Sequence, residues 1–162
     1  MNHTHDASRP FHTIVIGTDG SADSQVVVDA GGQLALASGS DAVHVVTGYR
    51  PLGELELAQL AHDLPDEFRT GLWSDQSGDV IVADACLRLR ALGVESTGHP
   101  IPAKGADAVL QVATEVGADL IVVGSDPHGP FGRILHRSVS TAVTQHAPCS
   151  VLVVRPPQES DS

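Results

Sequence analysis

Four short apolar runs rich in β-branched residues, and a fifth, more polar run, alternate along the chain with longer segments of helical periodicity. This alternation restricts the fold most, because repeated strand–helix–strand units are typical of a parallel sheet with crossover helices. The expected strands cover residues 13–17, 42–47, 94–101, 119–124 and 151–154. The expected helices cover residues 21–38, 77–92, 105–116 and 138–146. The pattern predicts a single α/β domain, an open, Rossmann-like, five-stranded parallel sheet with helices on both faces.

Length and composition agree with this fold class. The 162 residues suffice for one such domain and are too few for two. Hydrophobic residues make up 41% of the chain and aromatic residues only 3%, so the core must consist of Val, Ala, Leu and Ile, as in a sheet covered on both faces. We expect a flexible segment over 1–11, the domain over 12–155 and a flexible tail over 156–162.

The charge balance excludes some classes of partner. Nine Lys and Arg stand against twenty Asp and Glu, a formal net charge of −11, which argues against nucleic acid and anionic membrane surfaces as partners. No run approaches the roughly 20 apolar residues of a membrane span, and the N-terminus lacks the apolar core of a signal peptide. Cys86 and Cys149 lie in apolar segments, so we expect buried thiols, no disulfide and a cytoplasmic location.

The strength of the helical pattern differs along the chain. The pair Gly31 and Gly32 weakens the first helix by about 1 kcal/mol each, unless small residues there allow close packing on the sheet. The helix over 77–92 is expected from apolar residues that include Val80, Leu87 and Leu89. The secondary structure of residues 48–75 is the hardest to predict, and a short helix is expected within 52–64.

Two strand-to-helix turns compete as ligand sites, because ligands of such sheets bind outside the carboxyl ends of the strands. The first turn runs from Gly17 to Ser21 and places Thr18 and Asp19 at the end of a buried strand. Asp19 could accept hydrogen bonds from a ligand, or it could only stabilise the turn and the helix start. From the residues alone, both interpretations stay open.

The second turn, over residues 124–140, joins glycines and prolines to a helix start. Backbone N–H groups, the hydroxyls of Ser138 and Ser140, and the charges of Arg133 and Arg137 would suit a phosphate group. The alternative is an ordinary surface loop with Ser138 as the helix cap.

Several chemistries lack support. The sequence contains no phosphate-binding G-x-x-x-x-G-K-[ST], no G-x-G-x-x-G in the first turn and no G-x-S-x-G nucleophile turn. Nine histidines are spread without metal-ligand spacing, so no metal site is expected. No nucleophile can be paired with a base, so no catalytic residue is assigned and an enzyme is the least favoured class.

The order of several short motifs resembles the universal stress protein family over about residues 11–155. The matching pieces are IVIGTDGS at 14–21, VHVV at 43–46, ADLIVVGS at 118–125, RSVS at 137–140 and HAPCSVLVV at 146–154. The resemblance implies the five-stranded parallel sheet and a homodimer through the last strand, here Val151, Leu152, Val153 and Val154. Some members of this family bind ATP, some bind cyclic AMP and others bind no nucleotide.

The resemblance also implies a nucleotide site, with one departure from the family pattern. Asp19 and Val45 match the adenosine-side positions, and Gly124 matches the first glycine of the phosphate loop. Pro127 and Arg137 replace the second and third glycines, while the hydroxyl of Ser138 is kept. Proline removes an N–H donor and arginine fills space near the phosphate, so the phosphate half is expected to be altered. The full set of expected nucleotide-binding residues is Thr18, Asp19, Val45, Gly124, Arg137, Ser138, Val139 and Ser140.

Two functional hypotheses follow. In the first, the protein is a universal-stress-type regulatory protein that binds an adenine nucleotide (ATP, AMP or cyclic AMP) without substantial catalysis. In the second, it is a dimeric stress-response interaction module that binds no nucleotide and uses its loops for a partner. No cofactor other than an adenine nucleotide is expected.

Overall fold

The computed structural model describes residues 9–50, 75–125 and 139–157, together with residues 53, 55, 58, 59 and 62. The strands are β1 (Thr13–Gly17), β2 (Ala42–Gly48), β3 (Thr97–Ile101), β4 (Leu120–Gly124) and β5 (Ser150–Val154). The helices are α1 (Ala22–Ser38), α4 (Asp75–Ala91), α5 (Gly105–Val116) and α6 (Val139–His146).

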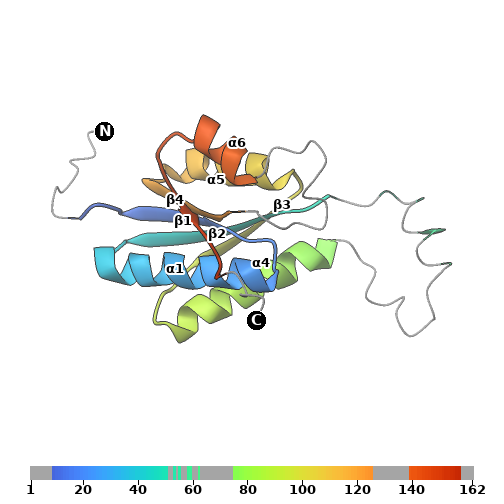
Figure 1. Cartoon of the computed structure of the whole chain (residues 1–162). Coiled ribbons are helices and arrows are strands. Elements are labelled where there is room, and N and C mark those ends of the chain that lie inside the picture. The colour runs from blue at the N-terminus through green and yellow to red at the C-terminus, as the bar shows by residue number, and fades with distance from the viewer. Residues whose placement is uncertain are drawn as a thin grey trace, which may run out of the picture.

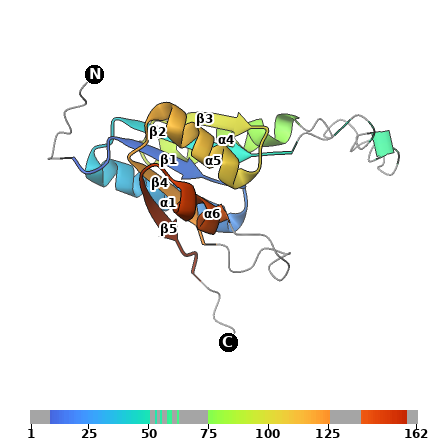
Figure 2. The same cartoon turned by 90° about the horizontal axis from the view of Figure 1, so that it is seen from above.

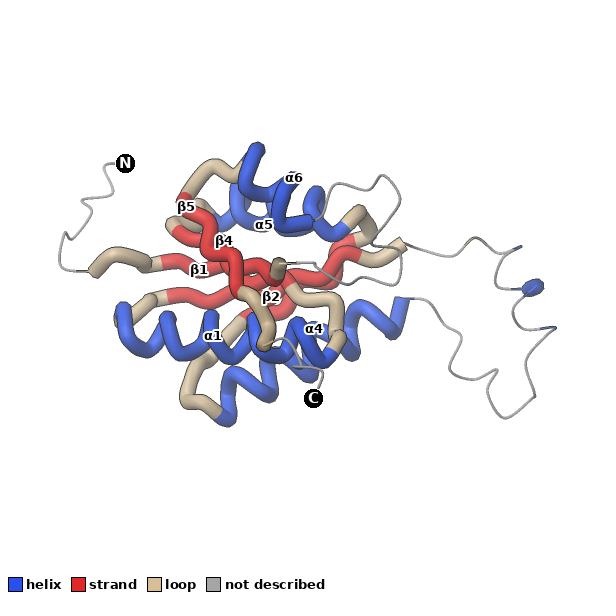
Figure 3. Tube along the Cα trace, in the orientation of Figure 1, coloured by secondary structure: helices blue, strands red, loops and turns tan. Residues whose placement is uncertain are grey.

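All five strands pair in parallel in the order β3-β2-β1-β4-β5, which confirms the predicted fold class. Helices α1 and α4 cover one face of the sheet, and α5 and α6 cover the other (Figures 1 and 2). The strand order reverses between β1 and β4, so this sheet has its topological switch point there. Figure 3 shows the five strands as one layer between the two helix layers.

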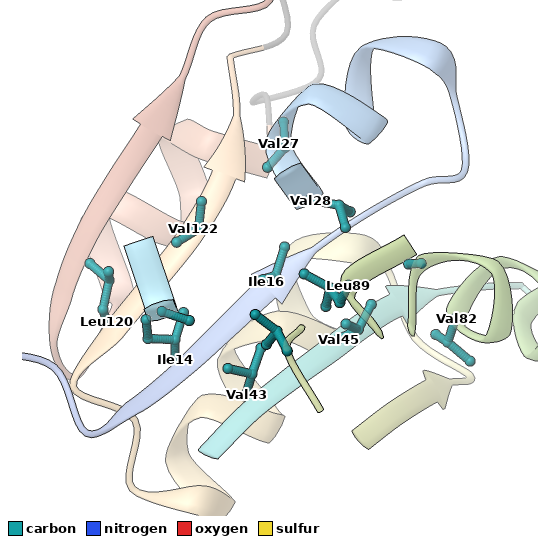
Figure 4. Packing of buried hydrophobic residues seen from close by; sticks show 13 residues of the cluster. Ile14, Ile16, Val27, Val28, Val43, Val45, Val82, Leu89, Leu120 and Val122 are labelled. Carbon is teal, nitrogen blue, oxygen red and sulfur yellow. The ribbon is translucent and has the colours of Figure 1, made fainter. Parts of the chain in front are cut away.

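The core is divided by the sheet into two clusters, as the alternation of side chains along a strand requires. On the α1 and α4 face, Ile14, Ile16 and Val45 pack against Val28 and Leu89 (Figure 4). On the α5 and α6 face, buried side chains of β1, β2 and β4 pack against the two helices. These residues include Val15, Val46, Val109, Val112, Ile121, Val123 and Val143.

The two central glycines of α1 allow close packing, as the sequence suggested. A Cβ at Gly31 would lie 2.5 Å from Cδ1 of Ile16, and one at Gly32 would lie 2.7 Å from Cδ2 of Leu89. Both distances are too short for real side chains, so the pair brings α1 against β1 and α4. The loss of helix propensity is thus offset by packing.

The helix expected over 77–92 is confirmed as α4, where Val82, Ala85 and Leu89 form the buried face and Val80 and Leu87 are each 64% exposed. Two other expectations need correction. The third strand begins at Thr97, since Val94 bonds back to Leu89 and closes the end of α4. Both cysteines are free, as expected, but only half-buried.

Other expectations fall largely outside the described residues. These include most of the short helix over 52–64 and the loop with Pro127, Arg133, Arg137 and Ser138. The division of the chain at residues 12 and 155 stays a prediction. Within the described part of the chain, no helix combines the length and apolarity needed to cross a membrane.

Candidate functional site

A cavity of about 270 Å³ opens at the carboxyl ends of the central strands. Ligands of open α/β sheets bind at this edge, near the switch in strand order. Its walls come from the ends of β1, β2 and β4, the starts of α1, α5 and α6, and the segment after β5. The described lining residues are Gly17, Thr18, Asp19, Ser21, Asp23, Ser24, Val27, Val46, Gly48, Gly105, Val109, Val123, Gly124, Ser125, Val139 and Pro156.

The turn after β1 is held by a chain of short hydrogen bonds. The N–H of Thr18 donates to the carbonyl oxygen of Val46 over 2.9 Å, which ties the turn to β2. The Thr18 hydroxyl donates to Oγ of Ser24 over 2.9 Å, and the Ser24 N–H donates to Oγ of the cap Ser21 over 3.2 Å. These bonds fix the orientation of the turn and of the first residues of α1.

Asp19 lies within this network and keeps its charge. Its Oδ1 accepts a hydrogen bond of 2.9 Å from the N–H of Ser21. Burial raises the pKa of the Asp19 carboxyl, but hydrogen bonds from Ser21 and Ser24 outweigh burial, so the pKa lies below its ordinary value. Asp19 is therefore an ionised hydrogen-bond acceptor at the cavity wall.

The end of β4 forms the opposite wall. A Cβ at Gly124 would lie 3.1 Å from Cγ2 of Val27, so the strand end approaches α1 closely. The N–H of Ser125 donates to the carbonyl oxygen of Val154 over 2.8 Å, which joins this wall to β5. The hydroxyl oxygen of Ser125 is buried and has no hydrogen-bond partner among the described residues. Such an atom costs about 1–3 kcal/mol unless a ligand or a water satisfies it.

The charges of the described walls have one sign. Asp19 and Asp23 are acidic, and the described lining contains no Lys, Arg or His. No group of three or more His, Cys, Asp or Glu in the described part of the chain could hold a metal ion. The described walls thus suit the hydrogen-bond donors of a base or a ribose better than a bare phosphate.

The structure brings most of the predicted site residues together. Thr18, Asp19, Gly124 and Val139 line the cavity. Ser140 is buried one residue further along α6 and is not among the lining residues. Arg137 and Ser138 lie outside the described residues.

Val45 is placed differently from the expectation. Its side chain is fully buried in the cluster beneath α1 and α4, while its neighbour Val46 lines the cavity. Because side chains alternate along a strand, a residue and its neighbour face opposite sides of the sheet. The side chain of Val45 therefore faces the core, and the role of Val45 in nucleotide binding stays a prediction.

Val46, Gly48 and Gly105 also line the cavity and were not among the expected site residues. Gly48 and Gly105 lie where β2 ends and where the helix after β3 begins, so the rule of carboxyl strand ends could have located them. Ser125, which directly follows β4 in the second candidate turn over residues 124–140, lines the cavity as well.

Comparison with known proteins identifies the same fold and family. Residues 10–155 match the model of the universal stress protein family. A universal stress protein of Mycobacterium tuberculosis (strain H37Rv) is 32% identical over 146 residues, which cover 89% of this chain and 96% of the relative.

Two solved structures illustrate the structural similarity. A universal stress protein in complex with cAMP is 29% identical and superposes with a TM-score of 0.68, covering 91% of this chain and 99% of its own. A universal stress protein from Archaeoglobus fulgidus in complex with dAMP is 21% identical, with a TM-score of 0.59 over 87% of this chain and 94% of its own. The second similarity supports the fold alone.

Proposed function

Since the chain belongs to the universal stress protein family, we propose that it is a regulatory protein that binds one adenine nucleotide in the cavity beside β1 and β4. The protein acts as a nucleotide-dependent binding module and not as a catalyst.

One observation carries this proposal. The cavity lies where the strand order reverses, between β1 and β4. One wall carries an oriented, ionised Asp19, and the other is formed by the end of β4 at Gly124, which packs closely on α1. The cavity volume of about 270 Å³ lies just below the usual range for ligand pockets, roughly 300–1,000 Å³, and suits a small nucleotide. The relative in complex with cAMP, which covers nearly the whole chain, gives independent support.

The charges suggest how the nucleotide is oriented. The acidic wall with Asp19 favours the base and ribose, whose N–H and O–H groups can donate to a carboxylate. The phosphate then belongs near the start of α6 at Val139, where a helix dipole favours negative charge. Arg137 and Ser138 immediately precede α6 in the sequence and would supply a charge and a hydroxyl there.

The absence of substantial catalysis is part of the proposal. A general base needs a pKa near the working pH, whereas the pKa of Asp19 is lowered. The described lining offers no histidine, lysine or cysteine for proton transfer or nucleophilic attack. We therefore expect an adenine nucleotide that is incubated with the protein to be recovered chemically unchanged.

We also propose a homodimer through β5. This strand pairs with β4 on one side only, at the edge of the sheet. Leu152 and Val153 on it are each 38% exposed. An apolar edge strand favours pairing with another chain, here antiparallel pairing with β5 of a second copy.

The second candidate function is an interaction module without nucleotide. The two carboxylates of the described wall, Asp19 and Asp23, favour it, since they repel an anionic ligand. Two measurements decide between the candidates. The supernatant of heat-denatured purified protein is analysed by chromatography for adenine nucleotide, and stripped protein is titrated with AMP and cyclic AMP by calorimetry. Binding near one nucleotide per chain supports the proposal, and no nucleotide in either measurement supports the interaction module.

A further inference from the structure

Two histidines from neighbouring strands are hydrogen-bonded to each other at the edge of the sheet. Nδ1 of His44 on β2 lies 2.9 Å from Nε2 of His99 on β3, and the ring centroids are 5.1 Å apart. In the strand register His44 faces Thr97 and His99 faces Val46, so the two rings are diagonal neighbours. They lie on the sheet face that Val46 shares with α5.

The protonation state decides whether this contact can persist. A neutral imidazole has one N–H donor and one acceptor nitrogen, so two neutral rings, or one neutral and one charged ring, can keep the bond. When both rings are protonated, both facing nitrogens carry a hydrogen and no acceptor remains. Two positive charges then face each other in a half-buried position, which is unfavourable.

The surroundings offer little to compensate these charges. On β2 and β3 the two histidines are the only titratable residues. The helix packed on β2 from the same side, α5, carries Asp107 and Glu115, both exposed, and Lys104 at its cap is exposed as well. The described charged residues of α4 lie on the other side of the sheet and are all exposed. They are Asp79, Asp84, Arg88 and Arg90.

A fall in pH therefore destabilises the pairing of β2 with β3. Burial and the charge of His99 both lower the pKa of His44 below its ordinary value near 6.5. The unfolded chain regains the ordinary value, so it binds the proton first as the pH falls. The pairing of β2 with β3 thus loses stability as the pH falls below about 6.5 and keeps it at higher pH.

The same strands build one wall of the ligand cavity. Beyond His44, β2 continues to Val46 and Gly48, which both line the cavity. A Cβ at Gly48 would lie 2.5 Å from the carbonyl oxygen of Ala103 and 2.7 Å from Cα of Gly105. The backbone of the connection after β3 therefore lies in close contact with the end of β2. A shift of β3 away from β2 would change this wall.

We propose that His44 and His99 form a proton-responsive clasp, which holds β3 against β2 while at most one ring is charged and loosens this edge and the adjoining cavity wall when both are charged. Its effect on nucleotide affinity rests on the proposed function. A fall of intracellular pH would then reduce the amount of bound nucleotide.

Amide hydrogen exchange tests the clasp directly. Exchange of β3 and of Gly48 and Gly105 is measured by NMR at about pH 7.5 and about pH 5.5, with correction for the intrinsic rates. In the natural sequence we expect protection at these amides to fall about threefold or more at the lower pH. In His99→Gln the amide can still bond to His44 but does not titrate, so protection should be nearly independent of pH. His44→Gln is the second variant, and His146→Gln on the exposed end of α6 is the control that keeps the natural response.

If amide protection responds to pH equally in the natural sequence, in His99→Gln and in His44→Gln, the proposed role of the two histidines is contradicted. Unchanged protection of β3 in the natural sequence at pH 5.5 would contradict it as well. Titration with AMP at both pH values gives the second readout. Affinity should fall with pH in the natural sequence and in His146→Gln, and much less in the clasp variants. If AMP binds at neither pH while the exchange responds as expected, the proposed function fails and the clasp stands.

Discussion

The carboxylate of Asp19 accepts a hydrogen bond of 2.9 Å from the backbone N–H of Ser21, the residue that caps α1. This contact joins the end of the first strand to the start of the first helix. It orients one carboxylate oxygen and holds the charged group at the wall of the cavity. A ligand donor that reaches Asp19 therefore meets an acceptor that is already positioned.

Replacing Asp19 should weaken nucleotide binding without unfolding the protein. Asp19→Ala removes the ligand's acceptor, and the expected loss is about 1–3 kcal/mol, the range for a hydrogen bond to a charged group. Asp19→Asn keeps an oxygen for the N–H of Ser21 and should lose less. Calorimetry measures both, with Asp107→Ala on the exposed side of α5 as the control. Equal affinity of Asp19→Ala and the natural protein would remove Asp19 from the site.

We expect additional phosphate groups on the nucleotide to leave the binding affinity unchanged or to lower it. By the resemblance to the family pattern, Pro127 and Arg137 stand at two glycine positions of the phosphate loop, so we expect a backbone donor and open space to be lost there. We expect AMP or cyclic AMP to bind at least as tightly as Mg-ATP. Titration of the three nucleotides in one buffer measures this order, and clearly tighter binding of Mg-ATP would show that the loop still encloses a triphosphate.

The dimer prediction is tested at Val153. Lysine at this position places a charge on the apolar edge of β5, and we expect Val153→Lys to sediment as a monomer while the natural protein sediments as a dimer. Val80→Lys is the matched control, because Val80 is 64% exposed but lies on α4. A dimer that survives Val153→Lys would place the interface elsewhere.

The contact between Gly48 and the start of α5 should be sensitive to a single methyl group. Gly48→Ala would put Cβ 2.5 Å from a carbonyl oxygen, and such overpacking costs about 1–3 kcal/mol. In Gly105→Ala the nearest neighbour of the new Cβ among the described residues is a methyl group of Val139 at 3.4 Å, so the free energy of unfolding of this variant should change by only about 0.5 kcal/mol. Urea unfolding of both variants gives the comparison, and equal stability would contradict the tight contact.

The fold was predictable because, along most of the chain, the spacing of apolar residues and the glycines at the ends of the expected elements indicated the same strands and helices. The run from Leu120 to Gly124 is apolar at every position, as expected for a strand buried on both faces. The face of α4 was not predictable in the same way. Val80 and Leu87 are as apolar as Val82 and Leu89, so residue type alone could not show which pair faces the sheet.

The lining of the candidate site was predictable at the ends of β1 and β4, where Asp19 follows a clear strand and Gly124 ends one. Residue type alone could not show that the side chain of Val45 faces the core while that of Val46 faces the cavity, because neighbours along a strand point to opposite faces. The pairing of His44 with His99 joins residues 55 positions apart, which only the strand register reveals.

The most direct test of the account is an NMR titration of isotopically labelled, nucleotide-free protein with AMP. Binding in the cavity predicts saturable shifts of the backbone amides of Thr18, Asp19, Gly124 and Ser125, which line it. The amides of Gly39 and Gly117, at the opposite ends of α1 and α5 from the cavity, should stay unchanged. The absence of saturable shifts, or shifts confined to residues away from the cavity, would contradict nucleotide binding at this site.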